Sequence, residues 1–187
     1  MPKADHNSLK SGNLLIAAAN LVDPNFSRSV ILLCEHIDPG SFGLVLNHPT
    51  DLSLKDLVSG LDVDAPIYKG GPVEENSLHF IHRCKSLDLE SIEVVPGVFW
   101  GGDFEGLMDY VASGEVDLED CRFFVGYSGW GPGQLREEVI SDSWYITDAT
   151  HQLVFIDDIT NQWRQVLKSM GPGYKMLSTF PDDPRLN

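Results

Sequence analysis

The chain has 187 residues, of which 42% are hydrophobic, 22% charged and 10% aromatic. This composition fits a folded domain and excludes collagen-like, coiled-coil and disordered chains. A chain of this length buries about 70% of its extended surface, so its core needs neither a disulfide nor a metal. The formal net charge of −15 opposes binding to nucleic acids and to anionic membranes, because both attract basic surfaces.

The three cysteines predict a cytoplasmic protein with reduced thiols. Cys34, Cys84 and Cys121 are odd in number, lie far apart and form no Cys-x-x-Cys pair. The N-terminus is polar and lacks the apolar segment of an export signal. The longest apolar stretch, residues 14–22, is too short to cross a bilayer, so we expect no membrane association.

Short apolar runs separated by turn residues predict strands in the first part of the chain. The predicted strands are Leu14–Ala17, Ser29–Cys34 and Phe42–Leu46, the last two joined as a hairpin. From Ser53 the apolar residues recur at spacings of three and four, which is typical of a helix. Ser53 and Asp56 have the spacing of N-terminal caps, so we predict a short helix there.

The rest of the chain alternates between strand and helix patterns. We predict strands at 67–68, 77–81, 92–100 and 122–127, and helices at 104–111, 134–140 and 159–170. Trp144–Thr147 and Gln152–Ile156 are predicted to form a second hairpin. No regular β-α-β repeat and no linker is visible, which favours a single α+β domain over residues 1–187 with a mixed sheet. Residues 1–11 and 175–187 are expected to be irregular tails.

The densest motif lies at residues 126–138, where a predicted strand runs through a glycine-rich turn into a helix. Its backbone amides could bind a phosphate or carboxylate, but Glu137 and Glu138 already supply negative charge there. Ser128 could be a nucleophile, but Trp130 occupies a position where a nucleophile elbow needs a small residue. We favour a third interpretation, in which the glycines permit a sharp reversal across which the aromatic residues pack.

A metal site is a further hypothesis that the histidines and cysteines raise. Cys34 and His36 would share one face of a strand, but His79 and His82 would point to opposite faces. No second pair has the spacing of a zinc finger. We therefore predict no metal site and no cofactor.

Four groups of residues also form recognisable motifs. They are Gly12–Ala17 with Asp23–Phe26 and Arg28–Val30; Gly43–Asn47 with Pro49; Tyr68–Val73; and Gly126–Trp130 with Gly133–Leu135 and Glu138. Later matches are Trp144, Phe155 and Trp163–Arg164. In combination these motifs resemble the AlgH/YqgE family of bacterial proteins, over nearly the whole chain from Gly12. The chain departs from the family pattern at Ala19, His48 and Arg136.

The resemblance implies an α+β fold with a bifurcated sheet curled into a pseudo-barrel and flanked by helices. Members of this family are labelled transcriptional regulators, although no biochemical activity is established for them. Nothing in the chain is typical of a helix-turn-helix, a zinc finger or an aromatic RNA-binding platform, and the basic residues are scattered. We therefore expect any regulatory role to act indirectly, through a protein or small-molecule partner.

The leading functional prediction is a cytoplasmic ligand- or protein-interaction module. Its surface is expected where residues 23–28, 47–49, 70–73 and 126–134 come together as loops on a rigid scaffold. The candidate ligand-binding residues are Asp23, Asn25, Arg28, Asn47, Gly70, Gly71, Tyr127, Gly129, Trp130 and Gln134. One alternative is a hydrolase or phospho-ligand enzyme that uses the glycine-rich turn. The other is direct DNA binding, which the net charge disfavours.

Overall fold

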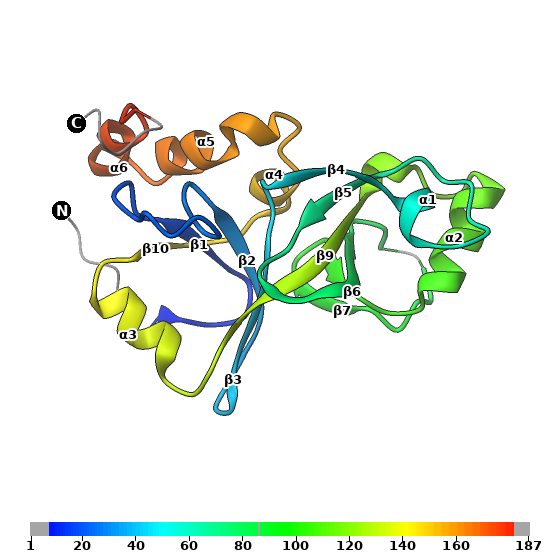
Figure 1. The fold of residues 1–187 in the computed structure, drawn as a ribbon, viewed down its shortest axis with the longest axis horizontal. Coiled ribbons are helices and arrows are strands. Elements are labelled where there is room, and N and C mark those ends of the chain that lie inside the picture. The colour runs from blue at the N-terminus through cyan, green and yellow to red at the C-terminus, as the bar shows by residue number, and fades with distance from the viewer. Residues whose placement is uncertain (1–7, 86, 182–187) are drawn as a thin grey trace.

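A computed structural model describes residues 8–85 and 87–181 of this protein. The strands are β1 (Asn13–Ala17), β2 (Val30–Ile37), β3 (Gly40–Val45), β4 (Pro49–Ser53), β5 (Pro66–Lys69), β6 (Val73–His82), β7 (Ile92–Val95), β8 (Val98–Trp100), β9 (Cys121–Trp130) and β10 (Trp144–Asp148). The helices are α1 (Leu54–Leu57), α2 (Phe104–Ser113), α3 (Gln134–Ile140), α4 (His151–Val154), α5 (Gln162–Ser169) and α6 (Pro172–Leu177), with 3₁₀ turns η2 (Leu118–Asp120) and η3 (Ile159–Asn161). Figure 1 shows the strands curled into a half-barrel with helices around it, which confirms the predicted α+β fold.

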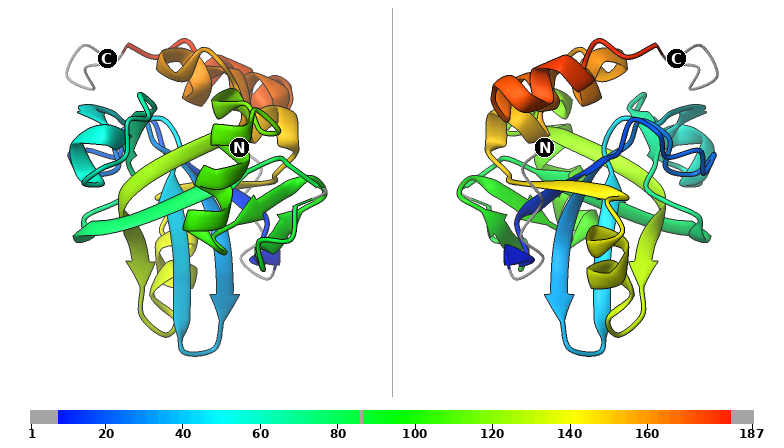
Figure 2. Two further views of the ribbon diagram at one scale, coloured as in Figure 1. Left: turned by 90° about the vertical axis from the view of Figure 1, so that its right-hand side faces the viewer. Right: turned by 90° about the vertical axis from the view of Figure 1, so that its left-hand side faces the viewer.

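Strand β9 joins two arms of the bent sheet. One arm has the order β10-β1-β2-β3, and β3 pairs with the last three residues of β9. In the other arm, the first half of β9 pairs in parallel with β5 and antiparallel with β6. The strands β8 and β7 follow β6, and β4 lies beside β5. The sheet is therefore mixed and forks at β9, and Figure 2 shows its arms from both sides.

Both faces of the sheet are apolar, because helices cover it from more than one side. In β1, the fully buried Leu14 belongs to an inner cluster that includes Phe124 and Trp163, whereas its neighbour Leu15 belongs to a cluster on the opposite face under α3. A third cluster packs Leu107 of α2 against the outer face of β6 and β9. Successive residues of a strand point to opposite faces, so a continuous apolar run is what a strand buried on both faces requires.

Glycines permit the close backbone approach at the fork. Gly126 has a φ of +67°, and a Cβ atom there would lie 2.7 Å from the carbonyl oxygen of Gly71. A Cβ atom on Gly70 would lie 2.3 Å from the carbonyl oxygen of Gly126. Side chains do not fit at such distances, so these glycines let the β5–β6 connection press against the bend in β9. This supports the architectural interpretation of the glycine-rich stretch.

The glycine-rich turn is shorter than predicted. Residues 126–130 continue strand β9, and only residues 131–133 connect β9 to α3. The prediction that the strand ends at residue 127 is wrong because β3 supplies pairing partners for the next three residues, at Gly43↔Ser128, Phe42↔Gly129 and Ser41↔Trp130.

The predicted second hairpin is also wrong. Residues 151–154 form α4, whose N-terminus is capped by Thr150, the side chain of which accepts a hydrogen bond from the N–H of Leu153. Strand β10 instead pairs with β1 along its whole length, from Asn13↔Asp148 to Ala17↔Trp144. Strand β1, which is distant in sequence and apolar on both faces, therefore pairs with β10 in place of the predicted local partner, Gln152–Ile156.

Two further differences concern short elements. The short helix predicted from Ser53 is confirmed over four residues, and Asp56 caps it as expected by accepting the Ser53 N–H at 2.8 Å. Strand β4, which precedes it, was not predicted. The irregular tail predicted from residue 175 is wrong for residues 175–177, which belong to α6. Residues 1–7 and 182–187 of the predicted tails lie outside the described residues.

None of the helices in the described ranges is long and apolar enough to cross a bilayer; α2 has ten residues. The same ranges contain no cluster of three or more histidine, cysteine or carboxylate side chains that could hold a metal.

Candidate functional site

The predicted segments contact one another through hydrogen bonds that hold the fold together. The Asn47 side chain accepts the N–H of Val30 and donates to the carbonyl oxygen of Arg28, both at 2.8 Å. It therefore fastens the 23–28 loop to the end of β3. The Arg28 guanidinium lies 3.9 Å from the ring centroid of Trp163 and donates to the carbonyl oxygen of Pro181, so it anchors the C-terminal helices.

Ser128 is a structural residue. Its side chain is completely buried, and its hydroxyl donates to the carbonyl oxygen of Gly70 at 3.0 Å. The Gly70 carbonyl also accepts the N–H of Val45, and the Gly70 N–H donates to Val125. A hydroxyl held in this way is out of reach of a substrate, which removes the geometric basis for Ser128 as a nucleophile.

A carboxylate organises the start of α3. Glu138 accepts the indole N–H of Trp130 at 2.9 Å and that of Trp144 at 2.8 Å on one oxygen, and the Gln134 amide at 3.0 Å on the other. Gln134 also accepts the N–H of Gly131. The side chains of the helix itself thus occupy the position where an anion would bind.

The remaining predicted residues divide between two hollows. Tyr127, Gly129 and Trp130 line a hollow of about 480 Å³ beside the β2–β3 hairpin. Asp23 lines a separate hollow of about 480 Å³, and its carboxylate accepts the N–H of Asn25 at 2.8 Å. The predicted segments therefore contact one another in the interior of the protein. At the surface, however, they line two separate hollows and share no single cleft.

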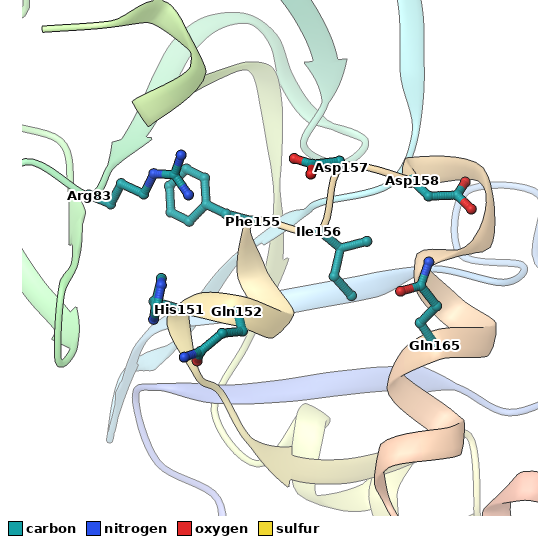
Figure 3. Close-up of a pocket in the computed structure, with 8 residues that line it drawn as sticks. All are labelled: Arg83, His151, Gln152, Phe155, Ile156, Asp157, Asp158 and Gln165. Carbon is teal, nitrogen blue, oxygen red and sulfur yellow. The ribbon is translucent and has the colours of Figure 1, made fainter.

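Sequence reasoning missed a larger depression on another part of the molecule. A hollow of about 570 Å³ lies where β5, the start of β9 and the α4–η3 connection meet. A second hollow of about 470 Å³, shown in Figure 3, adjoins it. Both are lined by Arg83 and Asp157, so we call them together the arginine groove. The other polar or ionisable lining residues are Asp64, Tyr68, Glu119, Cys121, Arg122, His151, Gln152, Asp158 and Gln165.

Arg122 is the buried charge of the arginine groove. Arg122 is only 8% exposed, and its guanidinium donates hydrogen bonds to the carbonyl oxygens of Val154 and Ile156. These bonds tie the α4–η3 connection to β9. The guanidinium also lies 5.4 Å from the ring centroid of Phe155 and 5.9 Å from that of Tyr68. In the described part of the chain, no carboxylate forms an ion pair with it.

Burial and a second cation make the charge on Arg122 costly. Burial lowers the pKa of Arg122, and the nearby charge of Arg83 lowers it too, whereas Tyr68 and Asp157 raise it. An arginine nevertheless keeps its proton in a protein. A buried positive charge without an ion-pair partner is unusual, because charges taken out of water need compensation.

Exposed residues form the rim of the arginine groove. Arg83 donates to Asp120 at 2.6 Å and lies 5.3 Å from the ring centroid of Phe155, as Figure 3 shows for the latter pair. Asp157, Asp64 and Glu119 are exposed carboxylates on the same groove. The groove therefore combines two guanidinium groups with an acidic rim.

The thiols give this groove no nucleophile. Burial raises the pKa of Cys121 to about 12, and burial also raises the pKa of Cys84, which contacts it. The pKa of Cys34 is raised most strongly, in the main core. The thiolate is the reactive form of cysteine, so these side chains stay protonated and inert at neutral pH.

The arginine groove escaped prediction because its residues are far apart in sequence. Asp64, Arg83, Arg122 and Asp157 come from four separate segments, and none belongs to a motif. The signal that was available is Arg122 itself, a charged residue within the apolar run of a buried strand. Such a residue needs partners that compensate its charge, and a bound anion is one of them.

Sequence comparisons relate the chain to proteins of similar length. The sequence profile described as AlgH-like matches residues 14–175. A UPF0301 protein of Chlorobaculum parvum is 42% identical over 180 residues, which cover 96% of both chains. A UPF0301 protein of Cytophaga hutchinsonii is 42% identical over 181 residues, which cover 96% of this chain and all of the relative.

Solved structures share the fold. A crystal structure of a Corynebacterium diphtheriae protein superposes with a TM-score of 0.78 over 94% of this chain and 95% of that one, at 22% identity, and supports the fold alone. The solution structure of the AlgH protein from Pseudomonas aeruginosa has a TM-score of 0.72 at 25% identity, over 97% of this chain and 98% of that one. Profile, relatives and fold agree, and the chain belongs to the AlgH-like family.

Proposed function

We propose that this protein is a binding module that takes a small zwitterionic molecule, of the class of free amino acids and dipeptides, into the arginine groove. The carboxylate of the ligand lies on Arg122 and Arg83, and its ammonium group lies on the acidic rim. Any regulatory role then acts through this ligand or through a protein partner, without direct contact to DNA.

The observation that carries this proposal is the buried guanidinium of Arg122. The guanidinium has five N–H donors, and two of them are used in the hydrogen bonds to carbonyl oxygens. Its positive charge has no ion-pair partner among the described residues. A carboxylate bound in the hollow would supply that charge and accept a pair of hydrogen bonds, which is the geometry that guanidinium groups favour.

The acidic rim decides which anions fit. Asp157 and Glu119 repel a polyanion such as DNA, as does the net charge of −15, whereas Asp64 is already paired with Lys55 at 3.1 Å. A ligand that also carries a cationic group turns this repulsion into attraction. The mixed lining thus favours a small molecule with both charges over a simple phosphate or a nucleic acid.

Isothermal titration calorimetry with a panel of free amino acids and dipeptides tests the proposal. Each probe is compared with its carboxyl-amidated and its N-acetylated forms, and at least one unblocked probe should bind while both blocked forms bind roughly tenfold more weakly. Arg122→Lys keeps the charge but loses the planar pair of donors, so it should weaken binding less than Arg122→Met does.

The matched control is Arg136→Met, which removes an exposed arginine from α3 and should leave the affinity unchanged. Circular dichroism and the melting temperature check that each variant folds, and Arg83→Gln gives a second variant that leaves the Arg122 hydrogen bonds intact. The proposal is wrong if no unblocked probe binds, if amidated probes bind equally well, or if Arg122→Met and Arg83→Gln both bind like the parent protein.

A further inference from the structure

A second surface carries an aromatic cluster that the arginine groove does not use. Phe42 of β3 stacks on Tyr127 of β9 and on Trp100 of β8, with centroid distances of 4.7 Å for each pair. The His79 ring meets Phe42 and Tyr127 edge-on, at 5.2 and 5.7 Å. These four side chains come from four strands and are all partly exposed. They therefore form a rigid aromatic surface on the half-barrel.

The hollow beside this surface, which we call the tyrosine pocket, opens next to the β2–β3 hairpin. Its volume is about 480 Å³, and it is lined among others by Glu35, Ile37, Phe42, Val73, Tyr127 and Gly129. Figures 1 and 2 show the tip of the hairpin projecting beyond the rest of the half-barrel. Ile37, close to that tip, is 51% exposed. The tyrosine pocket shares no lining residue with the arginine groove.

Gly129 fixes the position of the Tyr127 ring at the pocket. A Cβ atom on Gly129 would lie 3.1 Å from Cε2 of Tyr127 and 3.7 Å from Cγ2 of Val73. Gly129 itself is exposed, and its φ is not in the left-handed region, so the backbone there does not require glycine. The missing side chain therefore lets the Tyr127 ring pack closely against the backbone at the pocket.

The charge of the tyrosine pocket has one sign. Glu35 is its charged lining residue; it is exposed and lies opposite Phe42 in the β2–β3 register. Asp38 adds a second exposed carboxylate in the hairpin turn. Among the described residues, no lysine or arginine lines the pocket, and the whole chain carries a net charge of −15. Aromatic rings beside a carboxylate attract cations, and a planar guanidinium can stack on a ring while it pairs with the carboxylate.

We infer that the tyrosine pocket is an interaction surface for an arginine-bearing segment of a partner protein. One arginine side chain of that segment enters the pocket, stacks on the partly exposed Tyr127 ring and pairs with Glu35. The exposed apolar residues of the hairpin tip, Ile37 and Pro39, contact the neighbouring residues of the segment. The stacked rings are already held in place by four strands, so binding requires little ordering of the protein.

Capped peptides test this inference. The probe is an acetylated and amidated Gly-Arg-Gly-Arg-Gly peptide, and its partners for comparison carry lysine or glutamine in place of arginine. Binding is followed by ¹H–¹⁵N NMR, with shifts expected at Tyr127, Gly129 and Trp100. The arginine peptide should bind roughly threefold more tightly than the lysine peptide, and the glutamine peptide should not bind measurably.

Two variants separate a specific pocket from general attraction to an acidic protein. Gly129→Ala leaves the charge unchanged and should weaken binding of the arginine peptide about tenfold, because its Cβ atom would lie 3.1 Å from Cε2 of Tyr127 and displace the ring. Glu35→Gln should weaken binding of the arginine peptide about fivefold. The matched control Glu137→Gln on α3 removes the same charge elsewhere and should have little effect on this binding.

Equal weakening by Glu35→Gln and Glu137→Gln would show attraction to the net charge alone and overturn the inference. Equal binding of the arginine and lysine peptides, or unchanged binding by a folded Gly129→Ala protein, would also overturn it, as would the absence of any binding. The amino-acid panel for the arginine groove is a separate measurement, so failure of one proposal leaves the other standing.

Discussion

The fork at β9 and the arginine groove use polar groups in opposite ways. At the fork, Ser128, Asn47 and Glu138 all have hydrogen-bond partners within the protein, and the glycines let backbones touch. In the arginine groove, Arg122 is buried without an ion pair in the described residues, and carboxylates face solvent around it. A residue whose bonding capacity is filled holds the fold, whereas an unfilled one is available to a ligand. The comparison predicts large stability effects at the fork and small ones at the exposed carboxylates of the groove.

The largest effect is expected at Gly126. Gly126→Ala introduces a Cβ atom 2.7 Å from the Gly71 carbonyl oxygen and at a φ of +67°, so it should lower the free energy of unfolding by about 3 kcal/mol or more. Gly133→Ala is the matched control, because Gly133 also has a positive φ, of +76°, but has open space around it. It should cost about 1 kcal/mol. Urea denaturation measures both, and equal losses would show that contact at the fork contributes nothing.

Glu138→Gln should have the next largest effect. The amide offers one oxygen where the carboxylate offers two, so at least one of the donors from Trp130, Trp144 and Gln134 is left facing an N–H group. A loss of about 2 kcal/mol is expected in urea denaturation followed by tryptophan fluorescence. The neighbouring exposed residue provides the control, since Glu137→Gln should stay within about 0.5 kcal/mol of the parent protein. A neutral result for Glu138→Gln would contradict its role at the start of α3.

A smaller effect is expected on acidification. Burial lowers the pKa of His48, next to β4, and of His79, against Tyr127. A histidine whose pKa is lower in the folded than in the unfolded state stabilises the fold while neutral, and this contribution is lost as the pH falls below the unfolded pKa of about 6.5. The melting temperature should therefore fall between pH 7 and pH 5. The double variant His48→Asn, His79→Asn should show a shallower decline, and an unchanged slope would exclude these two histidines.

The smallest stability effect is expected at Asp157. This carboxylate is exposed and has no ion pair in the described part of the chain, so Asp157→Asn should change the free energy of unfolding by less than about 0.5 kcal/mol. The substitution should nevertheless weaken the binding of zwitterionic probes to the arginine groove, because the ammonium group of the probe loses a partner. Calorimetry and urea denaturation on the same sample measure both. A stability loss as large as that of Glu138→Gln would place Asp157 among the residues that hold the fold.

Local patterns predicted most of the strands and helices. The hairpin of β2 and β3, the α2 helix with Gly114 at its end, and α3 over Gln134–Ile140 follow from apolar spacing and from turn or capping residues, which are local properties of the chain. The pairing of β10 with β1 and the short strand β4 depend on partners far away in the sequence. Such pairings decide structure against local preference, and a single sequence does not display them.

The site was harder to predict than the fold, for a related physical reason. The motifs of the chain mark positions such as Gly70, Gly71 and Gly126, where the backbone tolerates no side chain. Sequence reasoning favoured an architectural role for the stretch that contains Gly126, but it predicted Gly70 and Gly71 as ligand-binding residues. The arginine groove depends instead on the meeting of Arg83 with Arg122, which are brought together by the pairing of β6 with β9. The tyrosine pocket lies between these cases, because Tyr127 and Gly129 were predicted as ligand-binding residues while Glu35 and Phe42 were not.

The shared strand β9 has a consequence for how the protein folds during its synthesis on the ribosome. Neither arm can be completed before residues 121–130 are synthesised, because β3, β5 and β6 all pair with β9. The pairing partner of β1, strand β10, is synthesised later still. Two-thirds of the polypeptide therefore emerges with unpaired strand edges and uncovered apolar faces. Nascent chains in this condition fold slowly and aggregate easily, so production of this protein should depend on chaperones that shield its N-terminal portion until translation is nearly finished.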